Sequence, residues 1–264
     1  MPRKAEAKHE YIHPLIYADP GTGKTVLAAS APNTLIIHPP ADNIGSALRM
    51  GYEFDEEVCR TWDEMTEIYE YLRHEDHGYE WVWWDGISLA QDELLHSIME
   101  DLVPEKPHRE LYIPDQREYM INFKRALEWI RYMIQLPFNF GITAHPYRFE
   151  IPDKNCDDPD DTEVLYMPWI QGKQMPEKVC GYMNIVGYLD VATDKEGNEH
   201  RVLYTKKRRN FYAKDQFGAF NGRMVDPTVP KIEKAIKEAI AKQPTKKRTR
   251  SSSTGKKTTT RRKS

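Results

Sequence analysis

A short string near the N-terminus has the residue types and the spacing that bind phosphate groups. Ala18-Asp19-Pro20-Gly21-Thr22-Gly23-Lys24-Thr25 fits the pattern of a P-loop, with alanine in place of the first glycine. The glycines let successive backbone N–H groups turn inward around phosphate oxygens, and a following helix adds its positive N-terminal dipole. We therefore expect ATP to bind at Asp19, Pro20, Gly21, Thr22, Gly23, Lys24, Thr25 and Val26.

Within this string, two side chains have predicted chemical roles. Lys24 is expected to contact the β- and γ-phosphates, and the Thr25 hydroxyl is expected to ligate Mg²⁺. A P-loop also needs an acidic residue at the end of a nearby strand to hold the metal. Asp85 fits, because it follows the apolar run Trp81-Val82-Trp83-Trp84 and precedes Gly86. Thr25 and Asp85 are thus the predicted metal residues.

Two further residues are catalytic candidates. His145 follows Thr143-Ala144 at the end of another apolar run, where a polar group could sense the γ-phosphate or orient the attacking water. It could equally be a capped strand end before Pro146, and both interpretations stay open. Asp42 is the only carboxylate within reach after the second predicted strand, so it is the candidate general base.

The elements that must position these residues alternate between strands and helices. Strands are predicted at 11–17, 34–37, 81–85 and 139–144, and helices at 26–30, 63–73, 88–102 and 115–136. Such alternation is the signature of a parallel sheet covered by helices, and hence of the α/β class. The apolar residues of the last of these helices are expected in the core rather than as a base-stacking platform; they are Tyr119, Phe123, Trp129 and Met133.

After His145 the pattern changes. Residues 151–163 are acidic and irregular, strands at 182–192 and 200–205 flank a turn at 195–198, and an amphipathic helix is predicted at 229–241. The later strands are expected to extend the same sheet in antiparallel fashion. We divide the chain into a charged lead-in at 1–10, a domain at 11–241 and a basic tail at 242–264, whose composition predicts disorder.

Charge separates this tail from the rest of the chain. It holds ten Lys or Arg residues and no acid, so the formal net charge of −3 leaves −13 on residues 1–241. Ten cations favour binding to a phosphate backbone, although a solubility tail or a partner-binding arm is the alternative. Apolar runs long enough to span a membrane are absent from the sequence, and Cys59, Cys156 and Cys180 are widely spaced. A cytoplasmic protein with reduced thiols and no membrane partner is expected.

The order of these motifs resembles the phage-encoded RecA-like nucleotide-binding ATPases, which include single-strand annealing recombinases. The resemblance covers roughly residues 11–241 and includes Thr61-Trp62-Asp63-Glu64, Pro168 to Lys173, Ala213 to Gly218 and Asp226-Pro227-Thr228. It departs at Gln216, where the family commonly has arginine in Lys-Asp-Arg, and after the second strand, where such ATPases place a glutamate.

The resemblance implies a RecA-like P-loop NTPase fold and an ATPase that single-stranded DNA stimulates in recombination, annealing or repair. It also implies self-assembly into rings or filaments with ATP at the subunit interface, and a possible single-strand binding protein as partner. A cation from a neighbouring subunit would reach the γ-phosphate, and the candidates for this role or for DNA contact are Lys206, Lys207, Arg208, Arg209 and Lys214. A nucleotide-kinase-type phosphotransferase and a non-hydrolysing nucleotide-binding scaffold remain the alternatives.

Overall fold

In a computed structural model, the described residues are 11–104, 108, 110, 112–152, 162–172, 174–208 and 210–242. Within them, nine strands form one sheet in the order β11-β9-β8-β1-β5-β4-β2-β3, with β10 also paired to β8. The strands of this sheet are β1 (Pro14–Tyr17), β2 (Thr34–His38), β3 (Asp55–Val58), β4 (Trp81–Trp84), β5 (Asn139–Ala144), β8 (Ile185–Thr193), β9 (Glu199–Tyr204), β10 (Lys214–Asp215) and β11 (Arg223–Val225).

The central strands are parallel and the C-terminal ones are antiparallel. β1 pairs in parallel with both β5 and β8, and β5 separates β1 from β4. β9 pairs antiparallel with β8, and β11 pairs antiparallel with β9. The carboxyl ends of β1, β4 and β5 consequently meet at one edge of the sheet, and there the polar residues that follow them converge.

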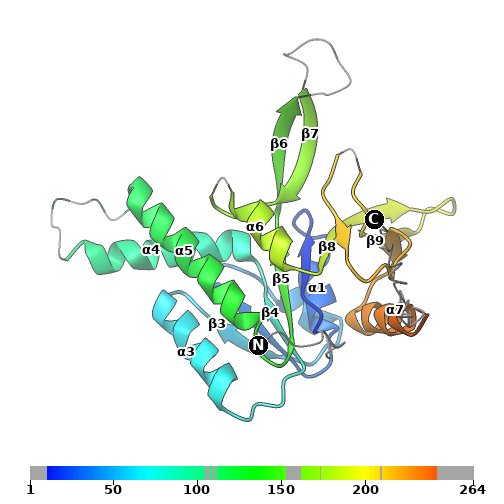
Figure 1. Cartoon of the computed structure of the whole chain (residues 1–264), viewed down its shortest axis with the longest axis horizontal. Coiled ribbons are helices and arrows are strands. Elements are labelled where there is room, and N and C mark those ends of the chain that lie inside the picture. Colours follow the sequence, from blue (N-terminus) through cyan, green and yellow to red (C-terminus); the bar gives the residue numbers. More distant parts are fainter. Residues whose placement is uncertain are drawn as a thin grey trace, which may run out of the picture.

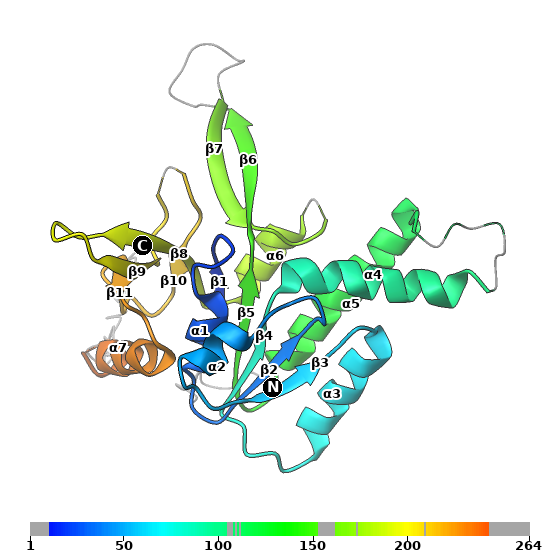
Figure 2. The ribbon, with the colours of Figure 1, turned by 180° about the vertical axis from the view of Figure 1, so that it is seen from behind.

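Helices cover both faces of the sheet (Figures 1 and 2). One face packs against α1 (Lys24–Ala29), α2 (Gly45–Arg49) and α7 (Val229–Lys242). The other packs against α3 (Trp62–His74), α4 (Ile87–Leu102), α5 (Gln116–Met133) and α6 (Met175–Tyr182). The predicted fold class is confirmed: a mostly parallel sheet with helices on both faces and an antiparallel C-terminal extension.

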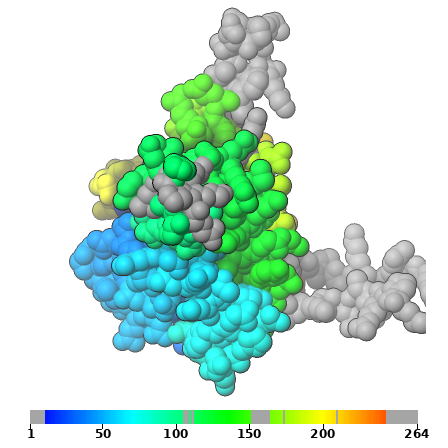
Figure 3. All heavy atoms as spheres, turned by 90° about the vertical axis from the view of Figure 1, so that its left-hand side faces the viewer, coloured from blue at the N-terminus to red at the C-terminus, as the bar shows by residue number. Residues whose placement is uncertain are grey.

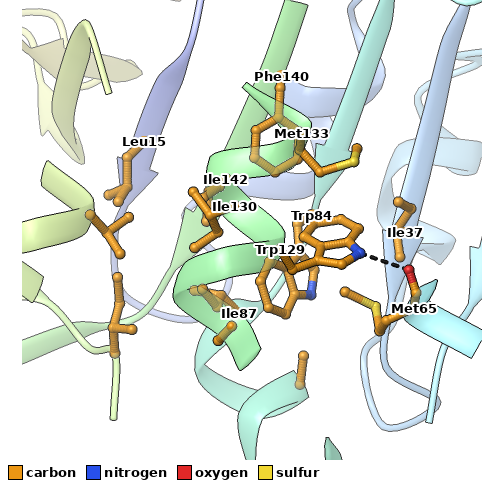
Figure 4. Packing of buried hydrophobic residues seen from close by; sticks show 14 of the residues in the cluster. Leu15, Ile37, Met65, Trp84, Ile87, Trp129, Ile130, Met133, Phe140 and Ile142 are labelled. Carbon is orange, nitrogen blue, oxygen red and sulfur yellow. Dashed lines mark hydrogen bonds between the residues drawn. The ribbon is translucent and has the colours of Figure 1, made fainter. Parts of the chain in front are cut away.

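Strand β4 shows why the sheet is buried on both sides. Successive side chains of a strand point to opposite faces, so Trp81 and Trp83 enter the α1–α2–α7 core while Val82 and Trp84 enter the other. Trp84 packs edge-on against Trp129 of α5 with ring centroids 5.0 Å apart. Trp129 in turn donates from its indole nitrogen to the Met65 carbonyl of α3 at 2.7 Å (Figure 4). Aromatic contacts thereby lock α3 and α5 onto the strand that ends at Asp85.

The helix starts that flank this core follow ordinary capping chemistry. Thr61 accepts from the Glu64 backbone N–H while the Glu64 carboxylate accepts from the Thr61 N–H, which is a capping box at the start of α3. Asp115 and Glu118 form the same box at the start of α5. The Thr61–Glu64 motif therefore has a structural role at a helix terminus.

One structural feature was not predicted, and one expectation was wrong. β6 (Pro146–Pro152) and β7 (Thr162–Pro168) pair as a long antiparallel hairpin that forms its own sheet, and residues 153–161 of the segment expected to be irregular lie outside the described residues. This hairpin stands out from the rest of the molecule (Figures 1 and 3). Tyr119 of α5 is 46% exposed, whereas Trp129 and Met133 are buried as expected.

Several predictions concern residues outside those described, namely the lead-in at 1–10, the tail from 243 onward, Cys156 and Arg209. The other two cysteines, Cys59 and Cys180, are buried free thiols, and burial raises the pKa of each to about 12. Among the described residues, none of the helices has the length and apolar composition that a membrane span requires.

Candidate nucleotide-binding site

The predicted phosphate-binding loop joins the end of β1 to the start of α1. Gly21 and Gly23 have φ angles of 79° and 103°, in the left-handed region that favours glycine. Thr22 holds the turn between them, since its hydroxyl donates to the Asp19 carbonyl at 2.8 Å. Gly23 is the N-cap of α1, and no acidic residue lies in the first turn of that helix. The two glycines thus fix the backbone path into α1.

This loop forms one wall of a cavity of about 430 Å³. The remaining walls come from the segment after β2, from α2, from the ends of β4 and β5, and from β9. The cavity is lined by Pro20, Gly21, Gly23, Lys24, Thr25, Val26, Ala41, Asp42, Asn43, Ser46, Arg49, Asp85, Leu89, His145 and Arg201. The fold therefore brings Lys24, Thr25, Asp85, Asp42 and His145 together, although they span more than a hundred positions of the sequence.

Lys24 is folded back onto its own loop. Its ammonium nitrogen donates to the carbonyls of Ala18 at 2.9 Å and of Asp19 at 3.1 Å, and the residue is only 8% exposed. Burial lowers the pKa of Lys24 from its ordinary value, and the charges of Asp85, Asp42 and Asp19 partly offset this. A bound polyphosphate would favour the ammonium form more strongly than carbonyl oxygens do, because it carries full negative charge.

Asp85 is the most deeply buried carboxylate of the site, at 1% exposure. Its Oδ1 accepts a hydrogen bond from the Thr143 hydroxyl of β5, and that hydroxyl accepts from the Gly86 N–H at 2.7 Å. Burial raises the pKa of Asp85, and the Asp42 charge raises it further, while Thr143, Thr25 and Lys24 act in the opposite direction. The carboxylate is therefore held in one orientation in an environment that disfavours its own charge.

The other oxygen of Asp85 points to a missing partner. Oδ2 is buried and accepts no hydrogen bond from the described residues. A buried carboxylate oxygen without a partner is costly, and a cation with its water shell would satisfy it. Oxygen donors of this kind suit Mg²⁺, so Asp85 and the neighbouring Thr25 hydroxyl fit the metal that P-loop ATPases generally bind together with ATP.

Asp42 approaches Asp85 across a glycine. An ideal Cβ on Gly86, whose φ is 78°, would lie 2.2 Å from the Asp42 Oδ2 atom, so only glycine admits the carboxylate there. Asp42 follows β2, as a general base in such a site would, and its charge acts on the pKa values of Lys24, Asp85 and His145. The structure thus puts the candidate base at the cavity wall, and its catalytic role stays a prediction.

His145 lies opposite the loop and is held through its backbone. Its N–H donates to the Ser88 hydroxyl at 2.9 Å, and its carbonyl accepts from the Trp169 N–H at 2.7 Å. Burial lowers the pKa of His145, and the Lys24 charge lowers it further. The imidazole is therefore neutral at neutral pH, which suits orientation of a water molecule or a phosphate oxygen.

None of the described basic candidates lines this cavity. Lys214 donates to the carbonyls of Cys180 at 2.9 Å and Gly181 at 3.4 Å, near the C-terminal end of α6. The Arg208 guanidinium lies over the Tyr204 ring at 4.3 Å, and Lys206 and Lys207 are exposed. Arg209 lies outside the described residues. Lys214 thus has a capping role within its own chain, and the reach of the others toward a neighbouring subunit stays a prediction.

Sequence reasoning missed two arginines of the cavity. Arg49 enters from α2, and Arg201 enters from β9, where its Nε donates to the Thr22 carbonyl of the loop at 2.9 Å. Thr22 and Arg201 are 179 residues apart, and Arg201 sits in an ordinary alternating strand without a motif. Its strand was predicted, but no local signal marks this arginine as part of a phosphate site.

A family model covers most of the chain, including the phosphate-binding loop. The family model described as AAA domain matches residues 10–217. No curated protein matches the chain. A solved structure described as a KaiC-like protein from the hyperthermophilic archaeon Pyrococcus horikoshii OT3 is similar with 13% identity and a TM-score of 0.43, over 83% of this chain and 91% of that one. The chain belongs to the AAA domain family, and it is a P-loop nucleotide-binding ATPase.

Proposed function

We propose that this protein is a Mg²⁺-dependent ATPase that single-stranded DNA stimulates, acting in phage DNA recombination, annealing or repair. One observation carries the hydrolytic part of the proposal. The Asp85 carboxylate has a buried oxygen without a partner in a cavity shared with Lys24 and Thr25, and this arrangement suits a metal-bound triphosphate.

Each residue of the cavity has a distinct task in this proposal. Lys24 exchanges the carbonyls of Ala18 and Asp19 for phosphate oxygens, and Thr25 and Asp85 hold the metal. When bound, the metal supplies positive charge to the phosphate oxygens. Asp42 accepts the proton of the attacking water, and neutral His145 orients it.

The DNA part of the proposal rests first on charge. The tail at 242–264 carries ten cations and no acid. Because the net charge of the whole chain is −3, residues 1–241 carry a formal charge of −13. A phosphate backbone is attracted to the tail and repelled by an acidic body, so the tail supplies the sequence-independent part of DNA affinity. The resemblance of the sequence to phage recombinases supports DNA as the polyanion that the tail binds.

Exposed aromatic side chains give a second support. Tyr119, Tyr147 and Trp169 are 46%, 47% and 36% exposed and line a cavity of about 340 Å³ at the base of the β6–β7 hairpin. Aromatic faces of this kind stack on unpaired bases. Ser88 connects this cavity to the ATP cavity, because its hydroxyl donates to the Trp169 carbonyl at 2.7 Å and accepts from the His145 N–H. DNA bound at Trp169 would therefore act on His145.

Assembly with a second copy completes the proposal. The exposed Lys206 and Lys207 lie away from the cavity of their own chain, so their place in catalysis would be the cavity of a neighbour in a ring or filament. A single-strand binding protein is a further expected partner. Both are independent of the ATP-binding proposal.

The deciding experiment is the rate of phosphate release with and without single-stranded DNA, with duplex DNA as the comparison. The Lys24→Ala variant serves as the control for contaminating activity. We expect stimulation by single strands only. ATP binding without hydrolysis under all conditions would identify a nucleotide-binding scaffold, and transfer of phosphate to a nucleotide acceptor would identify a kinase-type phosphotransferase.

A further inference from the structure

Arg201 connects the edge of the sheet to the phosphate-binding loop. Its side chain contacts the loop, and its backbone is hydrogen-bonded to Asp226. Its Nε donates to the Thr22 carbonyl at 2.9 Å. Its backbone N–H donates to the Asp226 Oδ1 atom at 3.0 Å, and its carbonyl accepts from the Asp226 N–H at 2.6 Å. The residue is thus anchored on β9 and reaches across to the loop after β1.

The contact with Thr22 fixes the orientation of a whole peptide group. The Thr22 carbonyl and the Gly23 N–H belong to one planar trans peptide, in which they point in opposite directions. Cis peptide bonds are absent from the described residues. A hydrogen bond that holds the carbonyl toward Arg201 therefore holds the Gly23 N–H away from it. In a glycine-rich phosphate loop, such N–H groups are the atoms that bind the phosphates.

The lack of a side chain at Gly23 allows the Arg201 side chain to come this close to the loop. An ideal Cβ at Gly23 would lie 2.5 Å from the Arg201 Nε atom, closer than real Cβ atoms come to any neighbour. Any other residue would displace the guanidinium, in addition to the strain that a φ of 103° imposes on a side chain. The absence of a side chain at Gly23 therefore serves Arg201 as well as the turn.

Asp226 holds the anchor in place. It lies between β11 and α7, and its Oδ2 accepts from the His200 ring at 2.8 Å while its carbonyl accepts from the Lys231 ammonium at 2.6 Å. Its φ of 44° is in the left-handed region, which Asp tolerates better than most residues. The His200 ring of β9 and the Lys231 ammonium of α7 thus both bond to the residue that fixes the Arg201 backbone.

We propose that Arg201 is a positioning residue of the nucleotide site, which aligns the Gly23 N–H for phosphate binding by tying the Thr22–Gly23 peptide to the β9–β11 edge. The inference rests on the proposed function only in taking the loop as the binding site of a nucleotide. It also makes that edge a place from which nucleotide affinity can be changed. A partner that moves β9 changes the affinity for nucleotide, and by linkage nucleotide changes the affinity for that partner.

The test measures ADP and ATP affinity by calorimetry for the wild type, Arg201→Lys, Arg201→Ala and Arg223→Ala. Arg223→Ala removes an exposed charge from β11 and is the matched control. We expect Arg201→Ala to weaken ADP and ATP by a similar factor, about tenfold, because the loop N–H groups bind phosphates common to both. Arg201→Lys retains a donor and recovers part of the loss. Loss of ATP affinity alone would mean direct contact with the γ-phosphate and would overturn the positioning role, as would unchanged affinity.

A second measurement is independent of nucleotide. Hydrogen exchange of the segment 19–25 in the nucleotide-free protein should be faster in Arg201→Lys and Arg201→Ala than in Arg223→Ala, because the Thr22–Gly23 peptide loses its restraint. Equal exchange in all variants contradicts the inference. If the wild type binds no nucleotide but the loop still loosens without Arg201, the proposed function fails while the positioning contact stands. Melting temperatures check that each variant is folded.

Discussion

The hydroxyl of Thr143 at the end of β5 donates to the Asp85 carboxylate at the end of β4, and it accepts from the Gly86 N–H at 2.7 Å. Because β5 lies between the P-loop strand β1 and β4, this single hydroxyl ties the end of the middle strand to the end of β4. It sets the orientation of Asp85 and leaves the Oδ2 oxygen as the open position.

Thr143→Val preserves the shape of this side chain and removes both hydrogen bonds. We expect a loss of about 1–3 kcal/mol in the free energy of unfolding, since Gly86 N–H and Asp85 Oδ1 are left buried without partners. Urea unfolding measures the change. Thr143→Ser keeps the hydroxyl but lacks the methyl group and is the control, so a loss in Thr143→Val no larger than that in Thr143→Ser would contradict a stabilising role for the two hydrogen bonds.

Lys24→Ala should abolish measurable ATP and ADP binding while the protein stays folded. The lysine is a phosphate ligand in our assignment, and its present partners are loop carbonyls rather than core groups. Calorimetric titration and a melting curve check the two halves of this prediction. Lys237→Ala, at an exposed position of α7, is the control. Wild-type affinity in Lys24→Ala would falsify the assignment of the site.

Asp85→Asn should bind nucleotide but turn it over far more slowly, because the charge facing the metal is lost while the loop is unchanged. The same variant should be more stable than the wild type in metal-free buffer at neutral pH. Burial raises the pKa of Asp85 above its unfolded value, so ionisation favours the unfolded state as the pH rises above about 3.8. Steady-state kinetics and urea unfolding in a chelator test both effects. Unchanged turnover would move the metal-binding role to another carboxylate.

His13 should make the protein sensitive to acid. Burial lowers the pKa of His13 from 6.5 to about 4, and its Nδ1 accepts from the Phe140 N–H at 3.4 Å. Below pH 6.5 the unfolded chain takes up a proton that the folded protein refuses, so stability falls as the pH drops from about 6.5 to about 4. The loss is on the order of 3 kcal/mol. Urea unfolding across this range should show a shallower pH dependence for His13→Gln, and parallel curves would contradict the assignment.

Removal of residues 243–264 should weaken DNA affinity and flatten the plot of log affinity against log salt. The effect should be the same for any base sequence, because Lys and Arg in such a tail contact phosphates. ATP binding should persist, since Lys24, Thr25 and Asp85 lie in the remaining part. Titrations at several salt concentrations compare the full chain with the truncated one. An identical slope, with precipitation of the truncated protein, would instead indicate a solubility tail.

The parts of the site that could be predicted are those encoded locally. The phosphate-binding loop is recognised from two glycines at fixed positions, and Asp85 is recognised from the apolar strand before it. Each signal lies within a few contiguous residues. Asp42 was a weaker candidate from its sequence position, and it reaches the cavity because Gly86 leaves room for its carboxylate. That space depends on the pairing of β2 with β4, which no local pattern specifies.

The residues that were missed or misjudged depend on distant contacts. Arg201 reaches the loop only because β8 alone separates β9 from β1, and strand order is a property of the whole sheet. Lys214 is also basic and lies in the same region of the chain, but its side chain extends toward the end of α6. The β6–β7 hairpin was not predicted from the sequence. The acidic residues between its two strands gave the segment the composition of a loop, and the aromatic alternation at Tyr147 and Phe149 is short.

The position of β1 in the sheet also determines when the site can form during synthesis. β1 precedes both of its neighbours, β5 and β8, in the chain, and hydrogen bonds connect Ile12 to Asn139 and His13 to Asn184 across 127 and 171 residues. Contacts so far apart in sequence close late and slow the folding of a chain. A nascent chain that ends before β8 therefore carries the phosphate-binding sequence without the sheet that shapes it. Nucleotide can therefore stabilise only a chain that extends at least through β8, although the phosphate-binding loop precedes β8 by more than 150 residues.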